Sequence, residues 1–265
     1  MNPLLSRIIG GPSALFVALA IVASHPTGSP AADAPTPKRP YDEIVPAAKI
    51  PLSEVSDEDL AYYFAIRWFS NRDYFRANRW FGIQTFQNPL DVWITQEIIY
   101  EVEPEVIIET GTYNGGSALL WASILQQIDR DGLILTVDIE DRTRKASQHR
   151  LWKRRVKFFH GSSTDPAIVR QLEPLIEGKR VLVILDSLHT PEHVQAELEI
   201  YSKFIPVGSY VIVQDTGIVK PFKAPNTGTE GIEAFLAATD EFEVDRSRER
   251  FRLTNNPGGY LKRVK

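Results

Sequence analysis

The chain has 265 residues, enough for one large domain with its own core but too few for two domains of ordinary size. Its 30 Lys and Arg residues face 34 Asp and Glu residues, and the resulting net charge of -4 gives no overall reason to bind nucleic acid. Because the sequence contains no cysteine, disulfides, thiolate metal sites and cysteine nucleophiles are excluded.

The first forty residues differ in composition from the rest. Arg7 precedes an apolar run at 14–23, and a segment rich in Pro and Ala follows. We expect residues 1–24 to be an export signal or an uncleaved membrane anchor, with an apolar extension of no targeting role as the alternative. Residues 25–40 are predicted to be a linker, and residues 41–265 the folded domain.

The domain is predicted to begin with helices. Ser56 precedes an acidic first turn and the apolar run 60–69, which is typical of a helix and its N-cap. A second helix is predicted near 91–101. Between them, residues 70–87 are aromatic without clear periodicity, and we expect an ordered loop or lid that covers a pocket.

From residue 105 onward the pattern becomes regular. Short β-branched runs alternate with helix-length segments, which predicts a doubly wound, mostly parallel α/β sheet of Rossmann-like type. The predicted strands are EVIIE (105–109), LILTVDI (133–139), VKFFH (156–160), VLVIL (181–185) and YVIVQ (210–214), and the predicted helices lie at 117–128, 166–177 and 191–201. Near the C-terminus, the runs FEVD, FRLT and YLKR suggest an antiparallel strand pair at the sheet edge.

Ligands of such a sheet bind beyond the carboxyl ends of its strands. The first strand is followed by the turn ETGTYNGGS at 109–117, whose glycines let a ligand approach the backbone. The following helix offers its N-terminal N–H groups, and the acid Glu109 suits the ammonium group of a ligand. The alternative is a plain structural turn.

Polar residues also follow the next two strands. Asp138 ends the second strand, where an acid accepts hydrogen bonds from a ribose diol, although a solvated acid is the alternative. A nicotinamide-binding protein would have the same acid after a G-x-G-x-x-G turn, which this chain lacks. The segment GSSTD at 161–165, with Ser162 and Ser163, follows the third strand. Its hydroxyls and its carboxylate either line an adenine pocket or cap the next helix, and the cap is the favoured interpretation for this segment alone.

Two carboxylates come from the ends of the following strands. Asp186 and Asp215 are placed to share a hard divalent cation such as Mg²⁺, which lowers the pKa of a bound hydroxyl. His189 then has the chemistry to remove the hydroxyl proton. The alternatives are that Asp186 caps a helix and that His189 is a hydrogen-bonded bystander.

The run RTRKASQHRLWKRR at 142–155 is strongly basic. Such runs usually form a solvated loop and helix face, which is the favoured interpretation. An anionic glycan or lipid head group is the alternative ligand.

These motifs resemble the cephalosporin hydroxylase and rhamnosyl O-methyltransferase family of class I methyltransferases. The resemblance covers about 80–263 and includes IIETGTYNGGSALLWASIL, VDIE, GSSTDP, VILDSLHTPEH and LTNNPGGYLKR. It implies transfer of a methyl group from S-adenosylmethionine to a hydroxyl of a small molecule, sugar or glycolipid, without a nucleic-acid partner.

The resemblance also implies site residues. The cofactor-binding residues are Glu109, Gly111, Thr112, Gly115, Ser117, Asp138, Ser162 and Ser163, and the ligands of Mg²⁺ are Asp186, Gln214 and Asp215. Similar macrolide-sugar methyltransferases use a histidine at the position of His189 as base. The family commonly has Glu-Asp where this chain has Gln214-Asp215, so we expect weaker Mg²⁺ binding.

Two other functions are weighed against methyl transfer. Gln214 and the signal-like segment both permit an exported binding protein with a degenerate methyltransferase fold. A nicotinamide-dependent oxidoreductase is less favoured.

The location of the domain is left open by the sequence. Arg7 before the apolar run, with no further Lys or Arg until Lys38, places the domain outside by the positive-inside rule. The methyl donor is made in the cytoplasm, which argues for cytoplasmic access. Association with a membrane through the N-terminal segment and assembly into a homo-oligomer are both open.

Overall fold

The computed structural model describes residues 56–70, 74, 76–128, 131–217 and 228–265. The predicted signal or anchor and the predicted linker lie outside these residues. Within them, no helix combines the length and hydropathy that crossing a bilayer requires.

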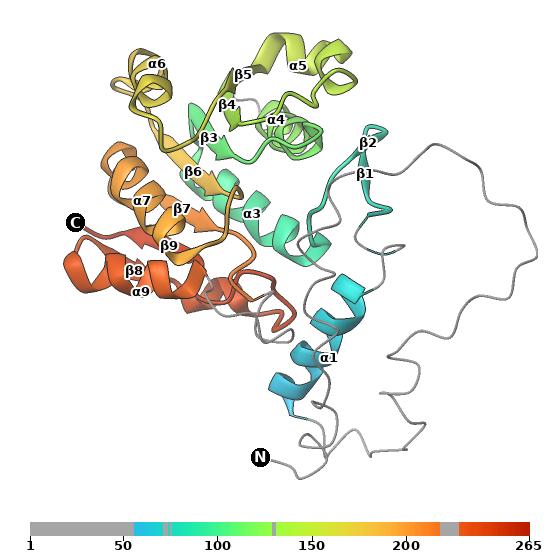
Figure 1. Ribbon diagram of the computed structural model, residues 1–265, viewed down its shortest axis with the longest axis vertical. Helices are drawn as coiled ribbons and strands as arrows, with labels where there is room; N and C mark the ends of the chain where they lie inside the picture. Colours follow the sequence, from blue (N-terminus) through green and yellow to red (C-terminus); the bar gives the residue numbers. More distant parts are fainter. Residues whose placement is uncertain (1–55, 71–73, 75, 129–130, 218–227) are drawn as a thin grey trace, which may run out of the picture. The chain divides into compact units, whose positions relative to one another are not determined.

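A seven-stranded sheet organises the chain (Figure 1). Its strands are β3 (Val106–Thr110), β4 (Leu133–Asp138), β5 (Val156–His160), β6 (Val181–Leu185), β7 (Tyr210–Val213), β8 (Phe242–Val244) and β9 (Tyr260–Arg263). The order across the sheet is β5-β4-β3-β6-β7-β9-β8, and β9 runs antiparallel to the other six strands. The first strand of the sheet, β3, lies in its middle; the next strands run out to the edge at β5, and the chain then returns to β6 on the other side of β3. This order confirms the doubly wound prediction and puts a topological switch point between β3 and β6.

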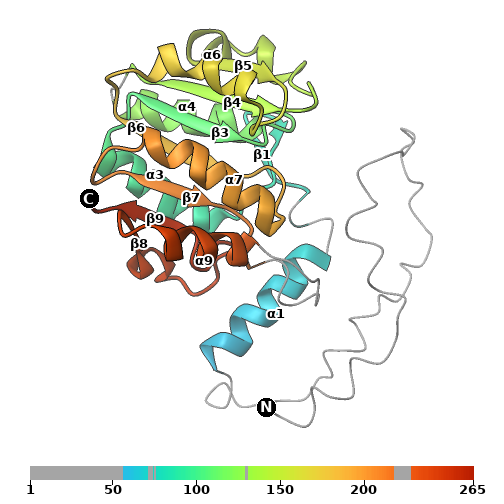
Figure 2. The ribbon, with the colours of Figure 1, turned by 60° about the vertical axis from the view of Figure 1, so that its left-hand side comes forward.

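Helices cover both faces of this sheet because strand side chains alternate between two buried clusters. Ile107 packs with α3 (Pro89–Val102), α4 (Gly116–Gln127) and α5 (Arg150–Arg155) on one face. Ile108 packs with α6 (Pro166–Ile176), α7 (Pro191–Tyr201) and α9 (Gly228–Ala238) on the other. Figure 2 shows α7 and α9 in front of the strands and α3 behind them. Both faces are thus buried, as continuous apolar strand runs require.

Side-chain caps set where the helices begin. Asn88 accepts a hydrogen bond from the Leu90 N–H at the start of α3, and Asp165 does the same for Ala167 in α6. The Thr190 side chain caps α7, whose first residue is proline. These caps fix the length of the loops at the carboxyl edge of the sheet, where the candidate site lies.

The N-terminal region differs in part from the prediction. The first helix, α1, spans Asp57–Ser70 as expected. The segment predicted as a loop or lid contains a two-stranded hairpin of β1 (Arg79–Trp80) and β2 (Ile83–Gln84). Each strand has two residues, which is too short for an alternating pattern to be recognised in the sequence.

The C-terminal strand pair was predicted correctly in kind but not in its members. β8 pairs with β9, whereas FRLT at 251–254 forms no strand. The reason is that the Thr254 hydroxyl and the Asn255 N–H both donate to the carboxylate of Asp91 on α3, which draws this segment away from the sheet.

The helix α9 was not predicted, because its two glycines lower helix propensity. Gly231 nevertheless has a packing role there. A Cβ on this residue would lie 2.4 Å from the Pro191 carbonyl oxygen, so glycine allows α9 to pack closely on α7.

We expect Gly111→Ala to lower the free energy of unfolding by more than about 3 kcal/mol. Gly111 has φ +87, and a Cβ there would lie 1.9 Å from the Asp186 carbonyl oxygen. Gly178 is the matched control, because it has φ +69 but no atom within 4 Å of the point where a Cβ would lie. Gly178→Ala should cost only about 1 kcal/mol. Urea unfolding of both variants measures the difference, and equal losses would contradict the role of the contact.

Candidate active site

The loop from β3 to α4 is attached to strands on both sides. Gly111 donates its N–H to the Val137 carbonyl of β4 at 2.8 Å and packs against the backbone of Asp186 beyond β6. Gly115 caps α4 in the left-handed conformation, and Thr112 is buried beneath the turn. The predicted glycine turn therefore lies at the switch point, where this class of sheet binds its ligands.

Glu109 lies below this loop and is 1% exposed. Its carboxylate accepts hydrogen bonds from the Trp121 indole at 2.9 Å, from the Thr136 hydroxyl at 2.6 Å and from the Ser117 hydroxyl. Burial raises the pKa of Glu109 to about 7. Contact of Glu109 with a ligand's ammonium group stays a prediction, and the observed hydrogen bonds give it a role in positioning the loop and α4.

Asp138 ends β4 beside the same loop. One of its carboxylate oxygens accepts the Tyr113 N–H at 2.8 Å, and the other accepts the Glu140 N–H at 2.9 Å. Tyr113 has φ 48, an uncommon conformation for a residue with a side chain, which the hydrogen bond to Asp138 holds in place. Each oxygen retains a lone pair, so Asp138 is able to accept the hydroxyls of a diol while it holds the loop.

The two serines after β5 have different hydrogen-bond partners. The Ser162 hydroxyl is 3.0 Å from the hydroxyl of Thr164 in its own turn. Ser163 is buried, and its hydroxyl lies 3.2 Å from Nε2 of His193 on α7. Asp165 of the same segment caps α6, so the cap predicted for 161–165 is present and is made by the carboxylate rather than by a serine. Their contact with an adenine ring stays a prediction.

Asp186, His189 and Asp215 come together beyond β6 and β7. The His189 Nε2 atom lies 3.9 Å from an oxygen of Asp186 and 3.7 Å from an oxygen of Asp215. One ligand atom from each residue falls within 4.8 Å of the others. The side chains are 32%, 21% and 23% exposed in the order His189, Asp186 and Asp215, so all three remain within reach of a ligand.

The electrostatics of this group favour a cation. Burial and the facing charge of Asp215 raise the pKa of Asp186 well above its ordinary value, and burial raises the pKa of Asp215 to about 7. In the described part of the chain, no Lys or Arg pairs with either carboxylate. An oxygen of Asp186 and an oxygen of Asp215 lie within 4.8 Å of each other, and carboxylate oxygens are the ligands that Mg²⁺ prefers. The residues present therefore fit a divalent cation.

Gln214 follows β7 next to Asp215 and has a hydrogen-bond partner of its own. Its side-chain carbonyl oxygen accepts a hydrogen bond from the Gln87 amide at 2.8 Å, and the same amide donates to Asp186 at 3.1 Å. Both glutamines are buried. Ligation of a metal by Gln214 stays a prediction, but its oxygen already has a donor, whereas Asp186 keeps its other oxygen directed to His189.

Gln87 and Asn256 are site residues that the sequence did not reveal. Gln87 comes from the segment before α3, far from any strand end. The Asn256 side chain accepts the N–H of Asp215, which has φ 59, at 3.0 Å. Asn256 thereby holds Asp215 in an uncommon backbone conformation. The motif NNPGG was the only signal for this support, and its glycines directed attention to a turn instead.

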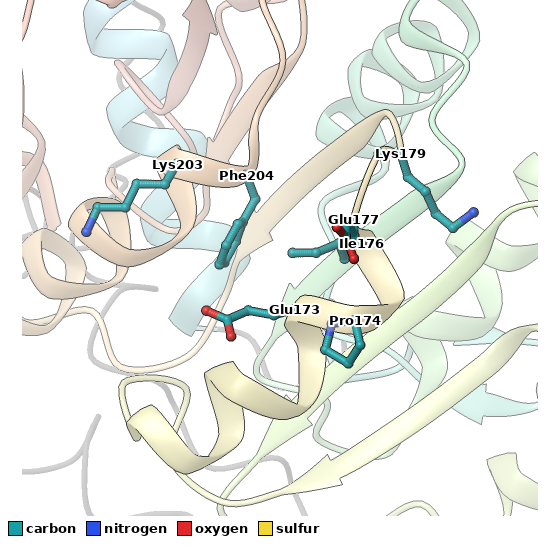
Figure 3. A pocket seen from close by; sticks show the side chains of 8 residues that line it. Glu173, Pro174, Ile176, Glu177, Lys179, Lys203 and Phe204 are labelled. Atoms are coloured by element: carbon teal, nitrogen blue, oxygen red, sulfur yellow. The ribbon is translucent and has the colours of Figure 1, made fainter.

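A separate hollow of about 550 Å³ has none of these residues in its lining, and Figure 3 shows the side chains that line it. It is lined by Glu173, Pro174, Ile176, Glu177, Gly178, Lys179, Lys203 and Phe204. Gly178 and Lys179 lead into the amino end of β6, so this hollow belongs to the opposite edge of the sheet from Asp186 and Asp215. Its lining mixes two glutamates with two lysines and includes none of the predicted site residues.

We expect Glu109→Gln to change how stability depends on pH. The pKa of Glu109 is about 7 in the folded chain, above its ordinary 4.5, so the folded chain retains a proton that the unfolded chain releases. The stabilising contribution is therefore full below about pH 4.5 and is lost as the pH rises through about 7. In the unmodified chain the free energy of unfolding should therefore fall by roughly 3 kcal/mol from this group as the pH rises, and Glu109→Gln should abolish that fall.

Urea unfolding across this pH range measures the effect. Glu233→Gln, at an exposed position of α9, is the control and should leave the decline as it is. A Glu109→Gln chain with the same pH dependence as the unmodified chain would contradict the assignment.

Comparisons with known proteins agree with this geometry. The profile of the family described as Rhamnosyl O-methyltransferase/CmcI matches residues 72–264. A rhamnosyl O-methyltransferase of Mycobacterium tuberculosis is 35% identical over 208 residues, which cover 74% of this chain and 82% of that protein. The rhamnosyl O-methyltransferase of Mycobacterium leprae is 31% identical over 203 residues, which cover 74% of this chain and 87% of that protein.

Solved structures show the same fold. A CmcI structure with Mg and SAM superposes with a TM-score of 0.57 at 18% identity, over 72% of this chain and 78% of that one. An apo structure of CmcI superposes with a TM-score of 0.55 at 21% identity, over 72% of this chain and 77% of that one. With the profile match and the relatives above 30% identity, the chain belongs to the rhamnosyl O-methyltransferase/CmcI family, which has the class I methyltransferase fold.

Proposed function

We propose that the chain is an S-adenosylmethionine-dependent O-methyltransferase whose acceptor is a sugar hydroxyl, such as that of a rhamnosyl unit of a glycolipid. The proposal is supported by relatives named rhamnosyl O-methyltransferase, of which the chain covers more than four fifths. The observation that carries it is the group of Asp186, His189 and Asp215 beside the glycine loop. This arrangement places acid–base chemistry next to a cofactor-binding edge.

The cofactor would be held by the loop and by the acid beside it. S-adenosylmethionine supplies a methyl group on a positively charged sulfur, which makes that group an electrophile. The loop at 111–115 offers backbone without side chains where a ligand must come close, and Asp138 offers two acceptor oxygens. Ser162 and Ser163 are proposed to lie beside the adenine.

His189 is proposed as the base. An acceptor oxygen that forms a bond to the methyl carbon, while the carbon–sulfur bond breaks, must release its proton. Burial lowers the pKa of His189, so its imidazole is neutral near pH 7 and able to take that proton. Asp186 and Asp215, less than 4 Å from Nε2, then stabilise the charged imidazolium.

The same two carboxylates would hold Mg²⁺, with Gln214 as a further proposed ligand. When bound, the cation would lower the pKa of the acceptor hydroxyl. The side-chain oxygen of Gln214 already accepts a hydrogen bond from the Gln87 amide, and this favours Asp186 and Asp215 as the main ligands.

Partners and location are further parts of the proposal. We infer that residues 1–24 direct the chain to a membrane or for export, and that the methyl donor requires access from the cytoplasm. The β1–β2 hairpin and the segment around it would help to select the acceptor. Assembly into a homo-oligomer remains a prediction. The family matches lend no support to an oxidoreductase or to a non-catalytic binding protein.

Asp138→Asn should weaken binding of S-adenosylhomocysteine by about ten- to a hundredfold, because a charged acceptor for the ribose diol is lost. Calorimetric titration of the full chain measures this affinity. Asp141→Asn is the matched control: Asp141 is exposed, lies three residues away and accepts hydrogen bonds from the N–H and the hydroxyl of Thr143. Equal affinities of the two variants would argue against the assignment of Asp138.

His189→Gln should lower kcat by a factor of about 10² to 10⁴, the range for a lost general base. Binding of S-adenosylhomocysteine should be unchanged, because His189 is not among the residues proposed to hold the cofactor. His160→Gln, at the exposed last position of β5, is the control. If His189→Gln kept its full kcat at neutral pH, another group would have to be the base.

A further inference from the structure

The basic run that the proposed function does not use forms one exposed surface. Residues 142–157 contain eight Lys and Arg residues and no acid, although the whole chain has a net charge of -4. Two of these cations are paired: Arg142 with Glu140, and the buried Arg155 with Asp131. The others that belong to the loop and to α5 are exposed, and we call them the basic surface: Arg144, Lys145, Arg150, Lys153 and Arg154.

The basic surface has a defined geometry. Arg150, Lys153 and Arg154 follow the i, i+3, i+4 spacing of one helix face, while Leu151 and Trp152 point into the core. In the described part of the chain, no carboxylate lies within ion-pair distance of any of its five cations. A folded face that concentrates unpaired charge of one sign is suited to a surface of the opposite sign.

An exposed aromatic residue stands next to these cations. The β1–β2 hairpin turns through Phe81 and Gly82, which have φ 47 and 76. Such two-residue turns ordinarily carry Asn-Gly, and a phenylalanine in the left-handed region costs about 1 kcal/mol. Phe81 is nevertheless 55% exposed, so its ring gains little burial in return. Strain together with exposure of a large apolar side chain points to a binding role.

Contacts join the hairpin tip to the basic surface. The Phe81 ring stacks on the ring of His149, the N-cap of α5, at 5.2 Å with 5° between the planes. The Lys145 ammonium group donates to the Gly82 carbonyl at 2.9 Å. The aromatic tip and the cations therefore form a single rigid surface.

We propose that this surface docks on a bilayer that contains anionic phospholipids. The cations would lie at the phosphate level, where each Lys or Arg contributes about 1 kcal/mol, and the Phe81 ring would enter the interfacial region. Gln84 of β2 accepts hydrogen bonds from Tyr113 and Asn114 of the glycine loop at 3.4 and 3.2 Å. A bilayer bound here therefore lies beside the loop proposed to bind the cofactor, where an acceptor carried on a lipid would be presented.

Sedimentation of the full chain with lipid vesicles tests the charge requirement. The chain should bind vesicles of phosphatidylcholine mixed with phosphatidylglycerol more tightly than vesicles of phosphatidylcholine alone, and rising salt should reduce that difference. Lys153→Gln with Arg154→Gln should weaken binding about thirtyfold, from about fivefold per cation. Lys179→Gln with Lys203→Gln is the control: both are exposed at the opposite-edge hollow in Figure 3, and the charge change is the same. Residues 1–55 are identical in all variants, so only the docking surface differs.

Phe81→Asn separates docking from folding. Asn favours this turn, so the variant should unfold at a higher temperature while it binds the anionic vesicles about tenfold more weakly. A merely structural Phe81 would predict no loss of binding.

The proposal would be overturned if Lys153→Gln with Arg154→Gln bound the anionic vesicles as tightly as the unmodified chain does. It would also be overturned if these substitutions dissociated an oligomer of the chain without any vesicle binding, because the surface would then face a second copy.

Discussion

The contact between Gly111 and the backbone of Asp186 connects the two halves of the site. Because glycine has no side chain, the loop after β3 reaches the end of β6 closely enough for the loop and the carboxylate group to share one edge of the sheet. The same residue donates its N–H to β4 and so joins a third strand end. Cofactor-binding backbone, Asp138 and Asp186 are thereby held together by the main chain rather than by mobile side chains, which is the kind of preorganisation that group transfer needs.

Around this contact, the fold buries several carboxyl groups, and burial raises the pKa of Glu109, Asp186 and Asp215. The carboxylate of Glu109 accepts hydrogen bonds from three donors, whereas Asp186 and Asp215 face one another, with His189 at 3.9 and 3.7 Å and the Gln87 amide donating to Asp186. Support for Asp215 comes from Asn256, and the segment that carries it is tied to α3 through Asp91, whose pKa burial raises to about 6. Elements distant in the sequence thus hold two carboxylates close enough to bind a cation and to steady a charged imidazole.

Much of this could be predicted from the sequence, and the exceptions have physical reasons. Buried β-branched runs and capped helices revealed the sheet, and its order placed Asp138, Asp186 and Asp215 at one edge. Gln87 was missed because an amide that acts through two side-chain hydrogen bonds leaves no periodic or positional trace. For the same reason, the sequence did not reveal that the Gln87 amide donates a hydrogen bond to Gln214. The hairpin was missed because its two-residue strands are too short to show an alternating pattern. FRLT was misjudged because tertiary hydrogen bonds to Asp91, rather than local propensity, decide its conformation.

The central claim is that the carboxyl edge around Gly111 and Asp138 binds the methyl donor. Hydrogen–deuterium exchange of the full chain, with and without S-adenosylhomocysteine, tests this most directly. The account predicts slower exchange at residues 111–115, 138–140 and 162–163, with no change around the hollow at Glu173 to Lys179. Protection at that hollow, or none at the three strand ends when the ligand is bound, would contradict it.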